Sequence, residues 1–190
     1  MFVLETRGER IAVLALAALM AATRIEHFGV GAIAPDASTA VFFLAGLLIG
    51  NPLWLLAFVA EALILDWTAI NAVGVESICV TAGYGMMIPA YTSLWLAARL
   101  ARPISNFDGA SLARLLGAGA AGLLAFFLFS NIGYYLGGGF EDAMGLEEYV
   151  RRVVRYLPNY LTSTLFYSAV GIALAVLAPR LSPQGRLAPR

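Results

Sequence analysis

The sequence predicts an all-α integral membrane protein, a single domain over residues 1–190 with six transmembrane helices and both termini in the cytoplasm. Three observations favour this fold. Hydrophobic residues make up 61% of the chain and charged residues only 13%, and the mean hydropathy is +0.81, so polar side chains are too few to cover a globular surface. The apolar residues gather in consecutive runs. The arginines are divided unequally between the connections of these runs.

Six apolar runs give the expected helices in chain order. The first follows Arg7 and Arg10 and could instead be a cleaved signal peptide, but no clear cleavage site is followed by a soluble domain. The second and third are short against the roughly 20 residues that cross the hydrocarbon. Only residues 50–52 separate them, so they could also form one kinked helix. The expected helices cover approximately residues 9–25, 37–50, 52–66, 77–100, 111–133 and 158–178.

The arginines decide between these topologies, because cytoplasmic connections carry an excess of positive charge. Six helices with an inner N-terminus leave eight arginines inside and four outside, whereas merging the second and third helices leaves five inside and seven outside. Six helices are therefore favoured. The four arginines on the outer side are Arg24, Arg151, Arg152 and Arg155.

The last outer connection contains the stretch LEEYVRRVVRYL, which predicts an amphipathic helix over approximately residues 146–157. Its apolar residues share one face, while Glu147 and Glu148 pair with Arg151 and Arg152 on the other. We expect Pro158 to end this helix. It would lie at the membrane interface, either as a lid over the outer mouth or as an inert cap.

Five of the eight tyrosines belong to the same outer region. An aromatic belt at the membrane interface explains many of them, but a belt forms at both interfaces and this group lies at one. The concentration favours a binding role, with Tyr134 and Tyr135 as candidates. The five are Tyr134, Tyr135, Tyr149, Tyr156 and Tyr160.

The stretch GVESICVTAGYG holds the only cysteine, Cys79, which can form neither an internal disulfide nor a zinc site of four protein ligands. Ser77 can cap the following helix, and a thiolate is favoured in the first turn. Asp66 and Glu76 disfavour the thiolate, whereas a bound metal ion would deprotonate the sulfur. Cys79 thus suits a soft metal ligand better than a free nucleophile, although a lone cysteine can also be a small buried hydrophobe.

Glycines and a proline interrupt the helix that follows Cys79, at Gly83, Gly85 and Pro89. Within a membrane such irregular backbone is tolerated where protein or a water-filled cavity surrounds it. We therefore expect a cavity beside Cys79 and Tyr84.

Four ionisable side chains from two outer connections are expected at this cavity. His27, the only histidine, is as a single residue more often a solvated loop residue than a ligand. Ionisable groups gathered at a membrane cavity nevertheless indicate a functional site. The four are His27, Asp66, Cys79 and Tyr84.

These four residues and the arrangement of the helices resemble those of a known family. The whole chain resembles the BtuM family of bacterial cobalamin transporters, which are related to the substrate-binding S-components of energy-coupling factor transporters. Besides the size and the six short helices, the resemblance rests on small-residue pairs of the first helix, Ala17/Ala21 and Ala18/Ala22, and on His27, Asp66, Cys79 and Tyr84, the last two within SICVTAGYG.

The resemblance implies an S-component-like bundle that captures cobalamin (vitamin B12) from the outer side and moves it across the bacterial inner membrane. It implies that Cys79 is an axial ligand to the cobalt of cobalamin, and that this ligation removes cyanide from cyanocobalamin. His27, Asp66 and Tyr84 would be the neighbours of Cys79, with Asp66 or His27 accepting the proton of the thiol.

The same resemblance implies a transmembrane coupling subunit and ATPases as partners, although some members of the BtuM group are solitary. The chain has no GxxxxGK[ST] motif and hence no ATP site of that kind, so ATP would have to act through partners. Its zero net charge suggests no nucleic acid partner. Membrane lipid is the expected surrounding.

Two other functions remain open at this point. The chain could be an S-component-like transporter of another vitamin, in which Cys79 is structural. It could also be a thiol-dependent membrane enzyme, with Cys79 as nucleophile and His27 as base acting on a lipid or quinone.

Overall fold

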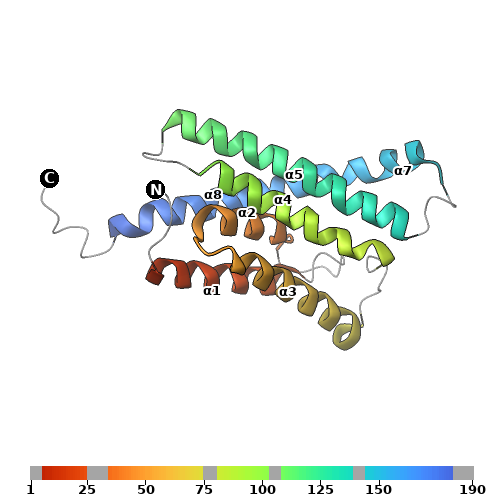
Figure 1. Cartoon of the computed structure of the whole chain (residues 1–190), viewed down its shortest axis with the longest axis horizontal. Helices are drawn as coiled ribbons and strands as arrows, with labels where there is room; N and C mark the ends of the chain where they lie inside the picture. The colour runs from red at the N-terminus through yellow and green to blue at the C-terminus, as the bar shows by residue number, and fades with distance from the viewer. Residues whose placement is uncertain (1–5, 25–33, 75–80, 103–107, 139–143, 182–190) are drawn as a thin grey trace, which may run out of the picture.

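The computed structural model describes residues 6–24, 34–74, 81–102, 108–138 and 144–181. Every regular element in these ranges is a helix, so the predicted all-α class is confirmed for the described chain. Figure 1 shows the long helices side by side and alternating in direction: α1, α3 and α5 run from left to right, and α2, α4 and α8 run back.

The helices follow the apolar runs of the sequence with ends shifted by a few residues, except the fourth. That helix was expected over residues 77–100, but the α-helix begins at Met87 and a 3-10 helix precedes it over Ala82–Met86. Between the α-helices lie shorter π- and 3-10 segments that the apolar pattern does not mark. In chain order the elements are α1 (Thr6–Thr23), α2 (Ser38–Leu48), α3 (Leu53–Thr68), the π-helix η2 (Ala69–Val73), the 3-10 helix η4 (Ala82–Met86), α4 (Met87–Leu100), α5 (Gly109–Gly137), α7 (Leu146–Val153), the 3-10 helix η5 (Val154–Tyr156) and α8 (Leu157–Leu181).

Helices α2 and α3 are separate helices rather than one kinked helix. Ile49, which follows α2, has extended backbone with φ −100° and ψ 130°. Pro52 then precedes α3 with φ −68°, a value that the proline ring favours and that suits the start of a helix. The backbone thus leaves helical geometry before Pro52 and re-enters it there.

Helix α2 is the centre of the bundle. All eleven of its residues are buried, and it packs against α1, α3, α4 and α8. The Phe42 ring of α2 stacks on the Tyr91 ring of α4 with 4.0 Å between centroids. Gly46 allows α2 to approach α4 closely, because a Cβ at this position would lie 2.2 Å from the main-chain oxygen of Trp95. An apolar sequence of this length therefore forms an enclosed core helix.

Two arginines, Arg99 in the last turn of α4 and Arg102 just after it, bind carbonyl groups at the C-terminal end of α2 and in the residues that follow α2. Arg102 donates from Nε to the Gly46 oxygen at 2.9 Å, and from Nη2 to the Ile49 oxygen. Arg99 donates to the Gly50 oxygen at 2.9 Å. The last carbonyl groups of a helix have no partner within the helix, so these contacts satisfy groups that burial would otherwise leave unpaired.

The amphipathic segment expected over residues 146–157 is α7 followed by η5. The expectation that Pro158 ends it is wrong, because the α-helix ends at Val153 and Pro158 is the second residue of α8. Proline fits the first turn of a helix, where its missing N–H has no partner to lose. The segment therefore continues into α8 through one turn of 3-10 helix.

Three described helical stretches are long and apolar enough to cross a membrane: Leu53–Val73, Gly109–Gly137 and Leu146–Leu177. Large hydrophobic side chains are exposed on them, including Leu124 and Phe166, whose exposed fractions are 62% and 63%. These surfaces suit lipid better than water. The six membrane crossings and the cytoplasmic termini stay predictions.

Candidate functional site

The structure describes four of the six expected site residues. Asp66 lies in the last turn of α3, Tyr84 in η4, and Tyr134 and Tyr135 near the end of α5. His27 and Cys79 lie outside the described residues. Asp66 and Tyr84 are the centre of the part of the site that the structure describes.

Asp66 forms a buried ion pair with Arg24, the residue that follows α1. Arg24 donates from Nε to Oδ1 and from Nη2 to Oδ2 of Asp66, both at 2.7 Å. The exposed fractions of the two residues are 1% and 2%. Such a bidentate contact fixes both the position and the plane of the carboxylate. Neither charge could stay buried without the other.

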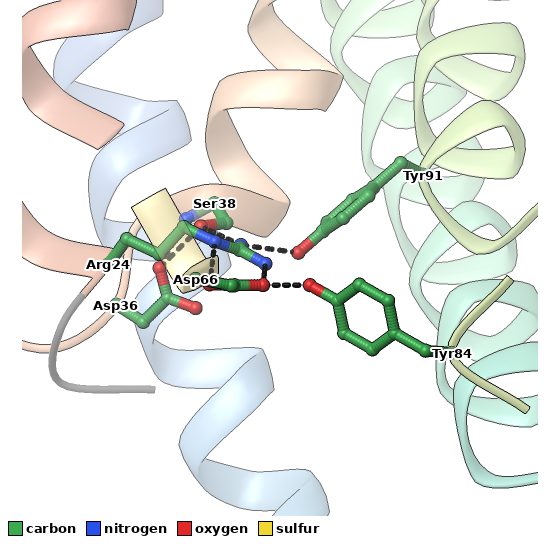
Figure 2. A network of polar contacts seen from close by, with 6 residues as sticks. All are labelled: Arg24, Asp36, Ser38, Asp66, Tyr84 and Tyr91. Atoms are coloured by element: carbon green, nitrogen blue, oxygen red, sulfur yellow. Dashed lines mark hydrogen bonds and ion pairs between the residues drawn. The ribbon is translucent and has the colours of Figure 1, made fainter. Parts of the chain in front are cut away.

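The remaining guanidinium nitrogen of Arg24 connects the ion pair to two further helices. Nη1 donates to the Ser38 hydroxyl of α2 at 2.8 Å and to the Tyr91 hydroxyl of α4 at 2.6 Å. Ser38 in turn donates from its hydroxyl to Asp36 at 2.6 Å. Figure 2 shows the six residues of this Arg24 network, which are Arg24, Asp36, Ser38, Asp66, Tyr84 and Tyr91.

Main-chain contacts hold the start of α2 in this position. The amide of Ala37 donates to the Thr23 hydroxyl at 3.1 Å, which ties the start of α2 to the end of α1. From α8, the Ser163 hydroxyl donates to the Asp36 carbonyl oxygen and the Tyr167 hydroxyl to the Pro35 carbonyl oxygen. The network is thus anchored on α1, α2, α3, α4 and α8.

Tyr84 of η4 also contacts Asp66. Its hydroxyl donates to Oδ2 of Asp66, the oxygen that also accepts from Arg24. Its element, η4, lies directly on α5 through glycines: a Cβ at Gly83 would lie 1.8 Å from the Gly133 oxygen, and one at Gly137 would lie 1.9 Å from the Gly83 nitrogen. No larger residue at Gly83 fits this contact, which sets the position from which Tyr84 points at Asp66.

A cavity of about 350 Å³ lies beside Tyr84. It is lined by residues of η4, α4, α5, α7, η5 and α8, and half of its lining residues are aromatic. Thr81, Ser130 and Asn131 add polar groups. The aromatic lining residues are Tyr84, Phe126, Phe127, Tyr134, Tyr156 and Tyr160. A large apolar wall with a few polar groups is typical of small-molecule sites.

The cavity brings together two of the tyrosines expected at the site, Tyr84 and Tyr134. Tyr135 is not among its lining residues: its hydroxyl donates to the Met144 carbonyl oxygen at 3.0 Å, and its ring lies 4.7 Å from the Tyr149 ring. Tyr135 therefore supports the connection between α5 and α7 in this structure.

A second cavity, of about 610 Å³, lies between α5 and α8. Its wall is almost wholly apolar, with leucines from both helices and the Phe43 ring of α2. It offers few groups that could orient a polar ligand, so the smaller cavity beside Tyr84 is the candidate site.

Sequence reasoning missed most of the Arg24 network. Arg24 entered the prediction only through its charge, and Asp36, Ser38 and Tyr91 did not enter it. A signal was available, because Arg24 and Asp66 are opposite charges at the ends of apolar helices on the same predicted side. The network occupies three of the about four acceptor positions of Asp66, which accepts from Arg24 twice and from Tyr84 once.

One protein-family model matches residues 5–184, nearly the whole chain, and its description is a family of unknown function, DUF6580. No curated protein matches the sequence.

Proposed function

We propose a function for this chain, which belongs to the DUF6580 family of unknown function: it binds cobalamin at the end of the bundle that carries Asp66 and Tyr84, and it moves cobalamin across the inner membrane of a bacterium. The three long apolar helices support a place in a membrane. The aromatic cavity supports a ligand with a large flat ring.

The observation that carries the proposal is the contact between Tyr84 and Asp66 at the wall of the cavity. The resemblance to cobalamin transporters implies both residues as neighbours of Cys79, and they are in contact although 18 positions separate them in the chain. Aromatic walls provide large contact areas for a macrocycle. Ser130 and Asn131 provide hydrogen-bonding groups for the amide side chains of cobalamin.

Cys79 is the proposed ligand of cobalt. In the sequence it precedes Thr81, a lining residue of the cavity, by two positions. The covalent chain alone keeps residues two positions apart within about 7 Å. Cobalt in cobalamin accepts soft axial ligands, and a thiolate is softer than the other side-chain donors of this region.

Removal of cyanide from cyanocobalamin follows from the same ligation. The thiol loses its proton to a base, the sulfur donates an electron pair to cobalt(III), and cyanide leaves with the electron pair of the cobalt–carbon bond. Cobalt remains cobalt(III), so the step requires no reductant. Asp66 already accepts three hydrogen bonds, which favours His27 over Asp66 as the acceptor of the proton.

Cobalamin requires more space than the cavity offers. Pockets for drug-sized ligands measure about 300–1,000 Å³, and cobalamin is larger than such ligands. A ligand of that size requires more room than 350 Å³. Tyr156 of η5 and Val153 of α7 close one side of the cavity, so we propose that this segment moves aside when cobalamin enters.

The same volume favours a second candidate, transport of a smaller vitamin, in which Cys79 is structural. The two candidates differ in the optical spectrum. Either transporter would take its energy from a coupling subunit with ATPases or would work alone.

The proposal is tested with the detergent-purified protein and cyanocobalamin. We expect the protein to retain the corrinoid after gel filtration, with a shifted visible spectrum and released cyanide. Cys79→Ser should abolish the shift and the release, because a hydroxyl is a harder and less acidic donor. Absence of any retained corrinoid would reject cobalamin and leave the smaller vitamin. Retention with an unchanged spectrum in both proteins would reject the thiolate ligand.

A further inference from the structure

Tyr84 is the member of the Arg24 network that also lines the aromatic cavity. Its ring forms part of the wall, while its hydroxyl binds the Asp66 carboxylate. Of the other five network residues, none is a lining residue. A ligand in the cavity can thus touch the ring of Tyr84 without touching Arg24.

Asp66 is a fixed acceptor for this hydroxyl because Arg24 holds both of its oxygens. The two contacts measure 2.7 Å each and form a planar pair. Arg24 is itself held at Nη1 by Ser38 and Tyr91. The chain of contacts therefore runs from the core, through Arg24 and Asp66, to one wall of the cavity.

We infer that Arg24 is a positioning residue for the cavity, which acts on a bound ligand through Asp66 and the Tyr84 hydroxyl without touching that ligand. Without Arg24, the carboxylate would no longer be held in one plane, and the Tyr84 ring would lose its fixed orientation. The inference goes beyond the proposed function, and it relies on that function only for the choice of cyanocobalamin as the probe.

Arg24→Lys tests this inference, because lysine keeps the charge but lacks the bidentate geometry. We expect the variant to weaken cyanocobalamin binding about tenfold, within the range of coupling between neighbouring residues. In a Tyr84→Phe background, where the ring stays but the hydroxyl is absent, the same substitution should change the affinity by less than about twofold. A structural role for Arg24 predicts the same loss in both backgrounds.

Tyr91→Phe supplies the matched control. Tyr91 also gives a hydroxyl to the network, but its ring stacks on Phe42 and does not line the cavity. In the Tyr91→Phe background the effect of Arg24→Lys should persist. An effect of Arg24→Lys that is equal in the Tyr84→Phe and Tyr91→Phe backgrounds would overturn the inference.

A second measurement, hydrogen exchange, requires no ligand. Hydrogen exchange at the amides of Ala82–Met86 should be faster in Arg24→Lys than in the wild type, and no faster in the double variant with Tyr84→Phe than in Tyr84→Phe alone. If the wild type does not bind cyanocobalamin, the proposed function fails and this measurement still decides the inference. If Arg24→Lys does not fold, Ser38→Ala replaces it, because it loosens Arg24 and keeps the charge. Unchanged exchange would overturn the inference.

Discussion

The two ends of helix α2 both involve arginine, but the arginines have different partners. At the Ser38 end, the buried Arg24 pairs with the Asp66 carboxylate and two hydroxyls. At the Leu48 end, the half-buried Arg99 and Arg102 donate to main-chain oxygens. One end holds side chains together, and the other completes the hydrogen bonds of a helix.

This difference indicates which end is a site. Carbonyl groups at a helix end need partners in any buried helix, so arginines there satisfy a general requirement of the fold. An ion pair is not required by the backbone, and replacing a buried pair with apolar residues is often neutral or stabilising. The Arg24 network also includes a wall residue of the cavity, Tyr84. The partners of a buried cation, rather than its burial, mark the candidate site.

The largest expected effect is at the Asp66 end. Asp66→Asn removes the carboxylate that the buried Arg24 binds at both oxygens, and breaking a buried pair on one side costs about 3–5 kcal/mol. Thermal unfolding in detergent measures the loss. The double variant Arg24→Met with Asp66→Leu removes both charges and should be more stable than Asp66→Asn alone. A wild-type unfolding temperature for Asp66→Asn would show that the ion pair does not matter for stability.

A smaller effect is expected at the other end of α2. Arg102→Gln removes charged donors from the Gly46 and Ile49 oxygens, and hydrogen bonds to charged groups contribute about 1.5–3 kcal/mol. Cyanocobalamin affinity should not change, because the cavity lies at the opposite end. The exposed Arg114 provides the control, and Arg114→Gln should leave the unfolding temperature unchanged. A loss of affinity in Arg102→Gln would remove the distinction between the two ends.

The glycine contact under Tyr84 gives the next prediction. Gly83→Ala places a Cβ against the Gly133 oxygen and pushes η4 away from α5, and overpacking of this kind costs about 1–3 kcal/mol. Affinity for cyanocobalamin should fall with stability, because Tyr84 moves with η4. Gly117 of α5 has no atom within 4 Å of an added Cβ, so Gly117→Ala should be neutral or stabilising. Equal effects of the two substitutions on unfolding and binding would contradict this packing.

The smallest expected effect concerns Asp108, which caps the start of α5 by accepting from the Ser111 amide at 2.8 Å. This hydrogen bond lowers the pKa of Asp108 below its ordinary 3.8, so its stabilising contribution is present above that pH and is lost as the pH falls through the lowered pKa. Asp108→Asn keeps a capping oxygen without the charge. The difference in unfolding temperature between wild type and variant should therefore shrink below about pH 4. A difference in unfolding temperature that does not change with pH would contradict the capping role of the Asp108 carboxylate.

The sequence predicted the long helices better than the short segments that connect them. Apolar runs marked all the long helices, because burial or lipid contact is a property of the run itself. The π-helix Ala69–Val73 and the 3-10 helix Ala82–Met86 were not predicted. Gly74 ends the former with φ 78°, and Gly83 seats the latter on α5, so both depend on local conformation or on contacts between distant segments.

The site was predicted in part for a similar reason. The family resemblance implied Tyr84 and Asp66 as neighbours of Cys79, which lies outside the described residues, and the structure has the two in contact with each other. Arg24 was not identified as the partner of Asp66: their opposite charges on the same predicted side made the pairing plausible, but the contact joins residues 42 positions apart and depends on how α1 meets α3. Counting the arginines on each side of the membrane placed Arg24 on the outer side but did not indicate its partner.

The short length of α2 also affects the electric field that a membrane potential would produce along it. Its eleven residues span about 16 Å, roughly half of the ~30 Å hydrocarbon core of a bilayer. If water reaches the polar groups at both of its ends, a potential of 100 mV, equivalent to about 2.3 kcal/mol per elementary charge, falls across this short insulating layer. The local electric field along α2 is then about twice that in unperturbed lipid. A charged group displaced along the axis of α2 would gain about twice the electrical energy per ångström.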